Sequence, residues 1–151
     1  MNTETMRVKY TPDGDTVRCL RPVIDTETGR QRVDEVRVRL IYIDAPEMDS
    51  AHYPRTWGLS ARRYLRRLLA LNEAVKVKLY GQDHYGRLLG EIERLNDAGN
   101  CGLRLVLGGY AALWQCPLAR SEYYDAQALA QRQRRGIWAQ DGPWQTPWQY
   151  R

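Results

Sequence analysis

Cysteine and histidine are scarce in this chain, and their scarcity argues against two common kinds of site. The three cysteines, Cys19, Cys101 and Cys116, show no CxxC spacing, and the two histidines, His52 and His84, lie far apart. An odd count without paired spacing argues against a disulfide framework and against a zinc cluster. We therefore expect buried or idle thiols, and histidines at the surface.

Long hydrophobic runs are also absent. No stretch approaches the roughly 20 apolar residues that a transmembrane helix needs. The first ten residues, MNTETMRVKY, contain no segment of signal-peptide type. We expect a cytoplasmic protein from the chain as given, or an exported one, periplasmic or secreted, if a leader was removed. The sequence leaves both open.

Length and charge indicate the number of domains and the kind of partner that the protein could bind. The 151 residues, without repeats or linkers, suit one domain over 1–151, with a Trp/Pro-rich tail at about 140–151 whose tryptophans should dock on the domain. The net charge of +5, from 23 basic and 18 acidic side chains, favours acidic partners such as nucleic acid only modestly. A soluble protein with a slightly basic surface fits the charge equally well.

Hydrophobic periodicity predicts five strands and three helices. Strands are expected at 6–10, 16–24, 35–43, 75–80 and 88–95, and helices at about 57–71, 103–109 and 121–134, the last capped by Ser121. The second and third strands should form a long hairpin. The order β-β-β-α-β-β-α-α matches the OB-fold, an α+β, mainly β class with a five-stranded Greek-key barrel.

Four arginines lie on the polar side of the first predicted helix: Arg62, Arg63, Arg66 and Arg67. Apolar residues recur at helical spacing on the opposite side, which is typical of a helix packed on a core. The arginines form either a solvated face or a stripe that binds phosphates. The sequence leaves this choice open.

Three clusters of charged residues fall at predicted strand ends. The first is DGDTV at 13–17, the second is RLIYI at 39–43 followed by DAPE at 44–47, and the third is DHYGR at 83–87. Each cluster by itself is compatible with a turn, because Asp and Gly form turns readily and a proline ends a strand ladder. A metal or phosphate site requires that the clusters come together.

In this order and spacing the clusters resemble the signature of staphylococcal nuclease and its homologues, the thermonuclease family. The resemblance runs from about residue 6 to residue 138. It includes Tyr53, Trp57, Gly58 and Ala61 around the start of the first helix, and RRGIW at 134–138. The tail PWQTPWQYR also resembles the ending of many bacterial members. The family fold is an OB barrel with three helices, which agrees with the predicted order.

The resemblance implies a calcium site. Asp15 and Asp44 match two carboxylates that hold the ion, and the main-chain carbonyl of Ala45 matches the third protein ligand. Alanine stands where the family's namesake has threonine, but a carbonyl ligand does not depend on the side chain. Asp13 matches an acid that acts on the metal through water, and Gly14 would permit the tight turn that brings the two acids together. Oxygen ligands without clustered His or Cys independently favour calcium over zinc.

The resemblance also implies three catalytic residues. Glu47 matches the carboxylate that orients or deprotonates the attacking water, and Arg39 and Arg87 match two phosphate-binding arginines. Phosphodiester hydrolysis adds negative charge to the phosphate, and a planar guanidinium meets that charge with bidentate hydrogen bonds that lysine cannot make. A carboxylate beside the attacking water can act as a general base.

One stretch departs from the family pattern. The namesake has two tyrosines after the second helix that flank the nucleotide, whereas the corresponding stretch here, ALWQCP at 112–117, has none. Trp114 either stacks on a base, as aromatic side chains on OB-folds do, or packs in the core or against the tail. Tyr85 has a family match; it either contacts substrate or, as we prefer, positions the loop that carries Arg87. Base preference therefore stays undetermined.

Two functions compete. The first is a monomeric, calcium-dependent endonuclease acting on DNA and RNA, preferably single-stranded or frayed, with low sequence specificity. By resemblance it attacks the 5′ P–O bond and leaves 3′-phosphates. The second is a catalytically silent module that binds nucleic acid or protein, because the family includes domains that have lost activity. Retention of Asp15, Arg39, Asp44, Glu47 and Arg87 favours the nuclease. An unrelated OB-fold binding protein would leave the coincidence of the three clusters unexplained.

Overall fold

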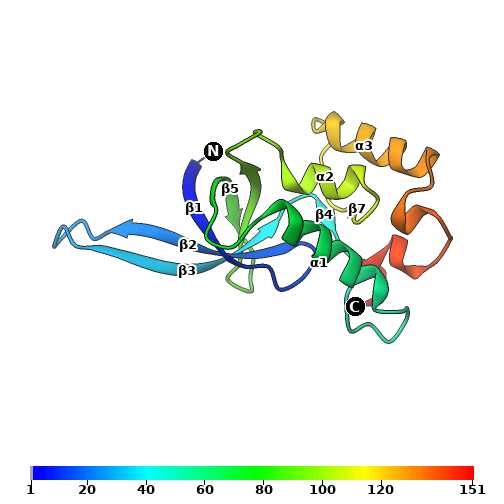
Figure 1. Ribbon diagram of the computed structural model, residues 1–151, viewed down its shortest axis with the longest axis horizontal. Helices are drawn as coiled ribbons and strands as arrows, with labels where there is room; N and C mark the ends of the chain where they lie inside the picture. Colours follow the sequence, from blue (N-terminus) through cyan, green and yellow to red (C-terminus); the bar gives the residue numbers. More distant parts are fainter. Residues whose placement is uncertain (1) are drawn as a thin grey trace.

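The chain folds into a closed five-stranded barrel covered on one side by helices (Figure 1). The structure is a computed structural model that describes residues 2–151. The barrel strands, in spatial order, are β1 (Asn2–Tyr10), β2 (Thr16–Ile24), β3 (Gln31–Leu40), β6 (Leu88–Arg94) and β5 (Ala74–Gln82). This order confirms the predicted OB-type barrel.

The barrel closes through one parallel pair. Strand β1 runs antiparallel to both β2 and β5, whereas β3 and β6 run parallel, with Arg39 opposite Leu89. A further two-stranded sheet, which the periodicity did not predict, pairs β4 (Ile43–Asp44) with β7 (Ala112–Leu113). The helices are α1 (Thr56–Leu68), α2 (Cys101–Leu107) and α3 (Ser121–Arg132).

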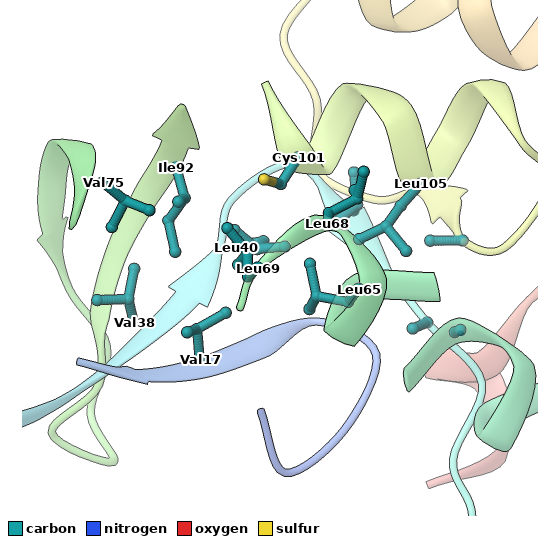
Figure 2. Close-up of a cluster of buried hydrophobic side chains, with 14 of the residues drawn as sticks. Val17, Val38, Leu40, Leu65, Leu68, Leu69, Val75, Ile92, Cys101 and Leu105 are labelled. Carbon is teal, nitrogen blue, oxygen red and sulfur yellow. The ribbon is translucent and has the colours of Figure 1, made fainter. Parts of the chain in front are cut away.

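The hydrophobic core extends from among the barrel strands to the helices, as Figure 2 shows. The barrel contributes Val17, Val38 and Ile92, and α1 contributes Leu65, all of them at 0% exposure. Burying a side chain of this size contributes about 1.5–3 kcal/mol. The core therefore fixes α1 against the ends of β2 and β3, where two of the charged clusters lie.

The predicted long hairpin is confirmed. Strands β2 and β3 pair from Thr16–Arg39 out to Ile24–Gln31 and extend beyond the barrel (Figure 1). Their distal apolar side chains are largely exposed to solvent: Ile24 is 64% exposed and Val33 is 63% exposed.

Several predicted boundaries are wrong: β1 begins at Asn2 rather than at residue 6, β3 begins at Gln31 rather than at residue 35, and α2 spans Cys101–Leu107 rather than 103–109. Three others differ for a local reason. Strand β3 ends at Leu40 rather than at residue 43, because Tyr42 takes a left-handed conformation with φ 73° that interrupts the ladder. Helix α1 ends at Leu68, since the extended backbone of Leu69 turns that side chain into the core. Ser121 is the first residue of α3 rather than its cap; Arg120 occupies the N-cap position.

The cysteines and histidines lie as expected. Cys19 and Cys101 are buried, and burial raises the pKa of each thiol to about 12, so both stay protonated. Cys116 is partly buried, and all three are free. His52 and His84 are exposed.

The C-terminal segment folds back beside α1 (Figure 1). It forms three short 3₁₀ turns, η1 (Gly136–Trp138), η2 (Pro143–Gln145) and η3 (Pro147–Tyr150). The Trp144 ring stacks on Trp57 with centroids 4.8 Å apart, and its Nε1 donates to the Ile137 carbonyl over 3.1 Å. The predicted docking of the tail is therefore confirmed. None of the helices within residues 2–151 is long and apolar enough to span a bilayer.

Candidate active site

Arg39 joins the first and second charged clusters. Its Nη2 lies 3.1 Å from Asp44 Oδ1 and 3.4 Å from Asp15 Oδ2, and all three side chains are buried. The chain brings them together through register: Asp15 directly precedes Thr16, which pairs with Arg39 across β2 and β3. Asp44 is the last residue of β4, which begins directly after the backbone reversal at Tyr42.

The turn that carries Asp13 is closed by its own side chain. Asp13 Oδ1 accepts hydrogen bonds from the backbone N–H groups of Asp15 (3.1 Å) and Thr16 (2.9 Å). A Cβ on Gly14 would lie 2.5 Å from Ala61 Cβ and 2.9 Å from Ala45 Cβ. Glycine is required here by this close approach to α1 and to residue 45, not by a special φ.

Burial and mutual repulsion shift the pKa values of the acids in this cluster. Burial, together with the neighbouring Asp15, raises the pKa of Asp13 to about 7 and that of Asp44 to about 6. Burial alone would raise the pKa of Asp15 as well. The Arg39 guanidinium and the Ala45 N–H, which donates to Asp15 Oδ2 over 2.9 Å, outweigh burial and hold that pKa below its usual value. The cluster therefore carries more buried negative charge than Arg39 offsets.

The acids offer an unpartnered oxygen to a cation. Among residues 2–151, Asp44 Oδ2 is buried and finds no hydrogen-bond donor, an arrangement that costs stability unless a positive group approaches it. Within residues 2–151, no three acidic, histidine or cysteine side chains gather into one metal-binding group. The candidate set is thus two carboxylates, Asp15 and Asp44, together with the Ala45 carbonyl.

Glu47 lies at the edge of this cluster. Its N–H donates to Tyr53 Oη over 2.8 Å, which fixes the backbone, while its side chain stays 39% exposed. Its carboxylate meets Arg151, whose Nε lies 2.7 Å from Glu47 Oε1. Sequence reasoning missed Arg151; the only signal was its position in a tail expected to dock.

The third cluster lies across a pocket from Arg39. Arg87 Nε donates to Asp83 Oδ2 over 2.8 Å, and Asp83 Oδ1 also accepts from the backbone of Tyr85 and Arg87. Burial opposes ionisation of Asp83, but these hydrogen bonds hold its pKa below the usual value. Asp83 therefore builds the loop and aims Arg87.

The pocket has a volume of about 350 Å³ and is lined by both arginines, Arg39 and Arg87. Tyr85 and Trp114 line it as well. Tyr85 is 66% exposed, and its ring lies 5.7 Å from the Arg87 guanidinium. The structure therefore brings Arg39, Arg87, Tyr85 and Trp114 to one pocket, and Asp15, Asp44 and Ala45 to one cluster beside it.

Comparison with known proteins places the chain among relatives of one family. A family model described as staphylococcal nuclease homologue matches residues 37–140. A protein of Bacillus subtilis named Endonuclease YhcR is 31% identical over 158 residues, an alignment that covers 92% of this chain but only 12% of that protein. A protein of Escherichia coli O157:H7 named Uncharacterized endonuclease is 30% identical over 145 residues, covering 96% of this chain and 83% of its own length. A protein of Haemophilus influenzae with the same name is 31% identical over 139 residues, covering 92% and 68%.

Proposed function

Because the chain belongs to the family of staphylococcal nuclease homologues, we propose that it is a calcium-dependent nuclease that hydrolyses phosphodiester bonds of DNA and RNA with low sequence specificity. The observation that carries the proposal is the convergence of Asp15 and Asp44 on one nitrogen of Arg39, beside a pocket that Arg87 also lines. Related proteins carry the name endonuclease, which supports the same class of activity.

The residues present fit a calcium ion. Asp15, Asp44 and the Ala45 carbonyl would hold it, with Asp13 acting through water, because hard oxygen donors suit calcium. The orphaned Asp44 Oδ2 and the raised pKa values of Asp13 and Asp44 support a positive occupant. When bound, calcium would supply positive charge to polarise the phosphate.

Arg39 and Arg87 would bind the phosphate. Both line the 350 Å³ pocket, and a guanidinium offers two parallel N–H groups to the oxygens of a phosphate. Stabilisation of charge that develops in the transition state is usually the largest catalytic contribution. Tyr85 and Trp114, which line the same pocket, would flank a base and favour single-stranded or frayed substrate.

Glu47 would orient the attacking water or remove its proton. Its fixed backbone and partly exposed carboxylate suit that role. A positioned general base contributes typically 10²–10⁴-fold to the rate. Glu47→Ala should therefore lower kcat by about that factor with little change in substrate affinity.

The test is digestion of single-stranded DNA with calcium, against a chelator control. The panel holds Arg87→Ala, Glu47→Ala and, as a matched control, Glu27→Ala in the exposed turn of the β2–β3 hairpin. We expect cleavage only with calcium, unchanged in Glu27→Ala and strongly reduced in the other two variants. Absence of calcium-dependent cleavage between neutral and alkaline pH would overturn the enzyme and leave the silent binding module as the better description.

A further inference from the structure

We propose that α1 carries a second substrate-binding surface, the arginine face, formed by Arg55, Arg62, Arg63, Arg66 and Arg67, which binds the nucleic-acid backbone beyond the scissile phosphate. This inference rests on the proposed function and extends its substrate site. Residues 56–68 contain four arginines and no acid, and Arg55 occupies the N-cap position of the helix. None of the five forms an ion pair within the described chain.

Part of the arginine face costs the helix stability, although Arg66 and Arg67 lie in the last turn, where the macrodipole favours positive charge. Arg62 with Arg66, and Arg63 with Arg67, are like charges at i,i+4 spacing, and each such pair destabilises a helix by roughly 0.2–0.5 kcal/mol. Arg55 places positive charge at the helix end where the macrodipole favours negative charge. A polyanion laid along the face would offset all three penalties, which is charge complementarity of the kind that nucleic acid provides.

The arginine face is continuous with the candidate active site. Arg55 lines a hollow of about 330 Å³ together with Asp13 and Glu47. Farther along the helix, Arg66 Nε donates to the Thr11 carbonyl over 3.1 Å, at the base of the loop that carries Asp13. Twelve residues of helix span about 18 Å, enough for several phosphates of one strand.

Salt dependence tests this surface without requiring cleavage. Binding of a labelled 20-nucleotide DNA strand is measured by fluorescence anisotropy in chelator over a range of salt. Arg63→Gln/Arg67→Gln removes two exposed charges from the face, and Arg132→Gln/Arg134→Gln removes two exposed charges elsewhere. We expect the slope of log Kd against log salt to fall by about 0.7 per lost contact, thus about 1.4 for the first variant, and to stay unchanged for the second.

Equal slopes for the two double variants would overturn the arginine face. Calcium-dependent cleavage of the same 20-nucleotide strand by wild type separates this failure from failure of the proposed function. If wild type does not cleave the strand, the nuclease proposal fails, while the salt slope still decides whether α1 binds DNA.

A different set of contacts carries a second inference, concerning the C-terminal segment. We infer that Arg151 competes with a cation for the oxygens of the candidate calcium site. Its Nη2 lies 2.5 Å from Asp44 Oδ1, 2.6 Å from Glu47 Oε1 and 3.5 Å from the Ala45 carbonyl. One positive nitrogen thus meets oxygens from three residues of the site. A guanidinium and a calcium ion favour the same carboxylate oxygens, and their like charges prevent them from sharing one.

Packing of the tail delivers Arg151 to this place. The Tyr150 ring lies 5.3 Å from His52, Pro147 is buried, and Trp144 stacks on Trp57. Because these contacts order the tail beforehand, the arginine binds with little further loss of conformational freedom. The tail is therefore expected to loosen when a cation binds.

Calcium titration by calorimetry tests this competition. Arg151→Gln should bind calcium about tenfold more tightly than wild type, whereas the control Arg134→Gln should not. Hydrogen exchange over 143–151 should speed up when calcium is added to wild type. Equal affinities for Arg151→Gln and wild type would overturn the competition and leave the proposed function intact. Absence of calcium binding in every variant would overturn both.

Discussion

Gly58→Ala tests how closely α1 supports the candidate active site. Gly58 is buried in the first turn of α1, directly behind the segment that carries Glu47. A Cβ at this position would lie 2.7 Å from the Glu47 carbonyl carbon and oxygen, and 2.7 Å from the Pro46 oxygen. All three atoms belong to the backbone, so no flexible side chain can move aside.

Two opposing effects set the size of the result. Alanine in place of glycine stabilises a helix by about 1 kcal/mol, whereas overpacking a tight contact costs typically 1–3 kcal/mol. Because the contact is with backbone, the second effect should win, for a net loss of up to about 2 kcal/mol in the free energy of unfolding. To reach ordinary contact at 3.4 Å, the segment would retreat by about 0.7 Å. A displacement near 1 Å can lower a rate by about 10²-fold.

Urea denaturation and cleavage kinetics provide the two measurements. Ser60→Ala, exposed on the same helix, is the control that changes helix propensity without a clash. It should leave kcat unchanged, while Gly58→Ala lowers kcat by about 10–100-fold. A Gly58→Ala protein that is both more stable than wild type and equally active would refute the reasoning.

Three further perturbations probe the supporting structure. Glu91 is buried and accepts from two tyrosines, an asparagine and an arginine. Burial opposes its ionisation, but these bonds hold its pKa below the usual 4.5, so its stabilisation is present above that pH and is lost as pH falls through the folded-state pKa. Glu91→Gln should cost about 3 kcal/mol at pH 7 and progressively less below pH 4.5 in urea titrations. Tyr53→Phe leaves the Glu47 N–H without its acceptor and should cost about 1–2 kcal/mol, together with a fall in kcat. Trp144→Ala loses the stacking on Trp57 and should cost about 2 kcal/mol, with faster proteolysis of the tail.

Matched controls keep these outcomes interpretable. Glu27→Gln, in the exposed hairpin turn, should follow the wild-type pH profile of stability. A Glu91→Gln profile parallel to wild type would contradict the role assigned to that carboxylate. Tyr10→Phe, at a 43% exposed tyrosine, should be neutral where Tyr53→Phe is not. Equal proteolysis of the tail in Trp144→Ala and wild type would show that stacking does not hold it.

Periodicity predicted the barrel well because strand alternation and helical spacing are local properties of the sequence. The prediction of strand ends failed where the backbone reverses although the apolar pattern continues. Ile41, Tyr42 and Ile43 continue the apolar run of β3, and nothing in their identity signals the positive φ of Tyr42. That reversal is what turns Asp44 toward Arg39.

The candidate site likewise has parts that local sequence patterns predict and parts that depend on distant contacts. The DGDT, DAPE and DHYGR clusters were visible because each is contiguous, and the structure brings the first two onto Arg39. Arg151 meets Glu47 from 104 positions away, a contact that depends on packing of the tail and leaves no local pattern. The four arginines of α1 were visible in the sequence as charge, but only the structure shows that they form no ion pair among residues 2–151.

The parallel pairing of β3 with β6 also has a kinetic consequence. It joins Val38 to Leu88 and Arg39 to Leu89 across a long intervening segment, and Arg87 directly precedes β6. Such non-local contacts form slowly, since the chain must first close a large loop. Arg39 and Arg87 therefore come to face one pocket only when the barrel closes. A chain caught before that step would have its strands but not the pocket that Arg39 and Arg87 line.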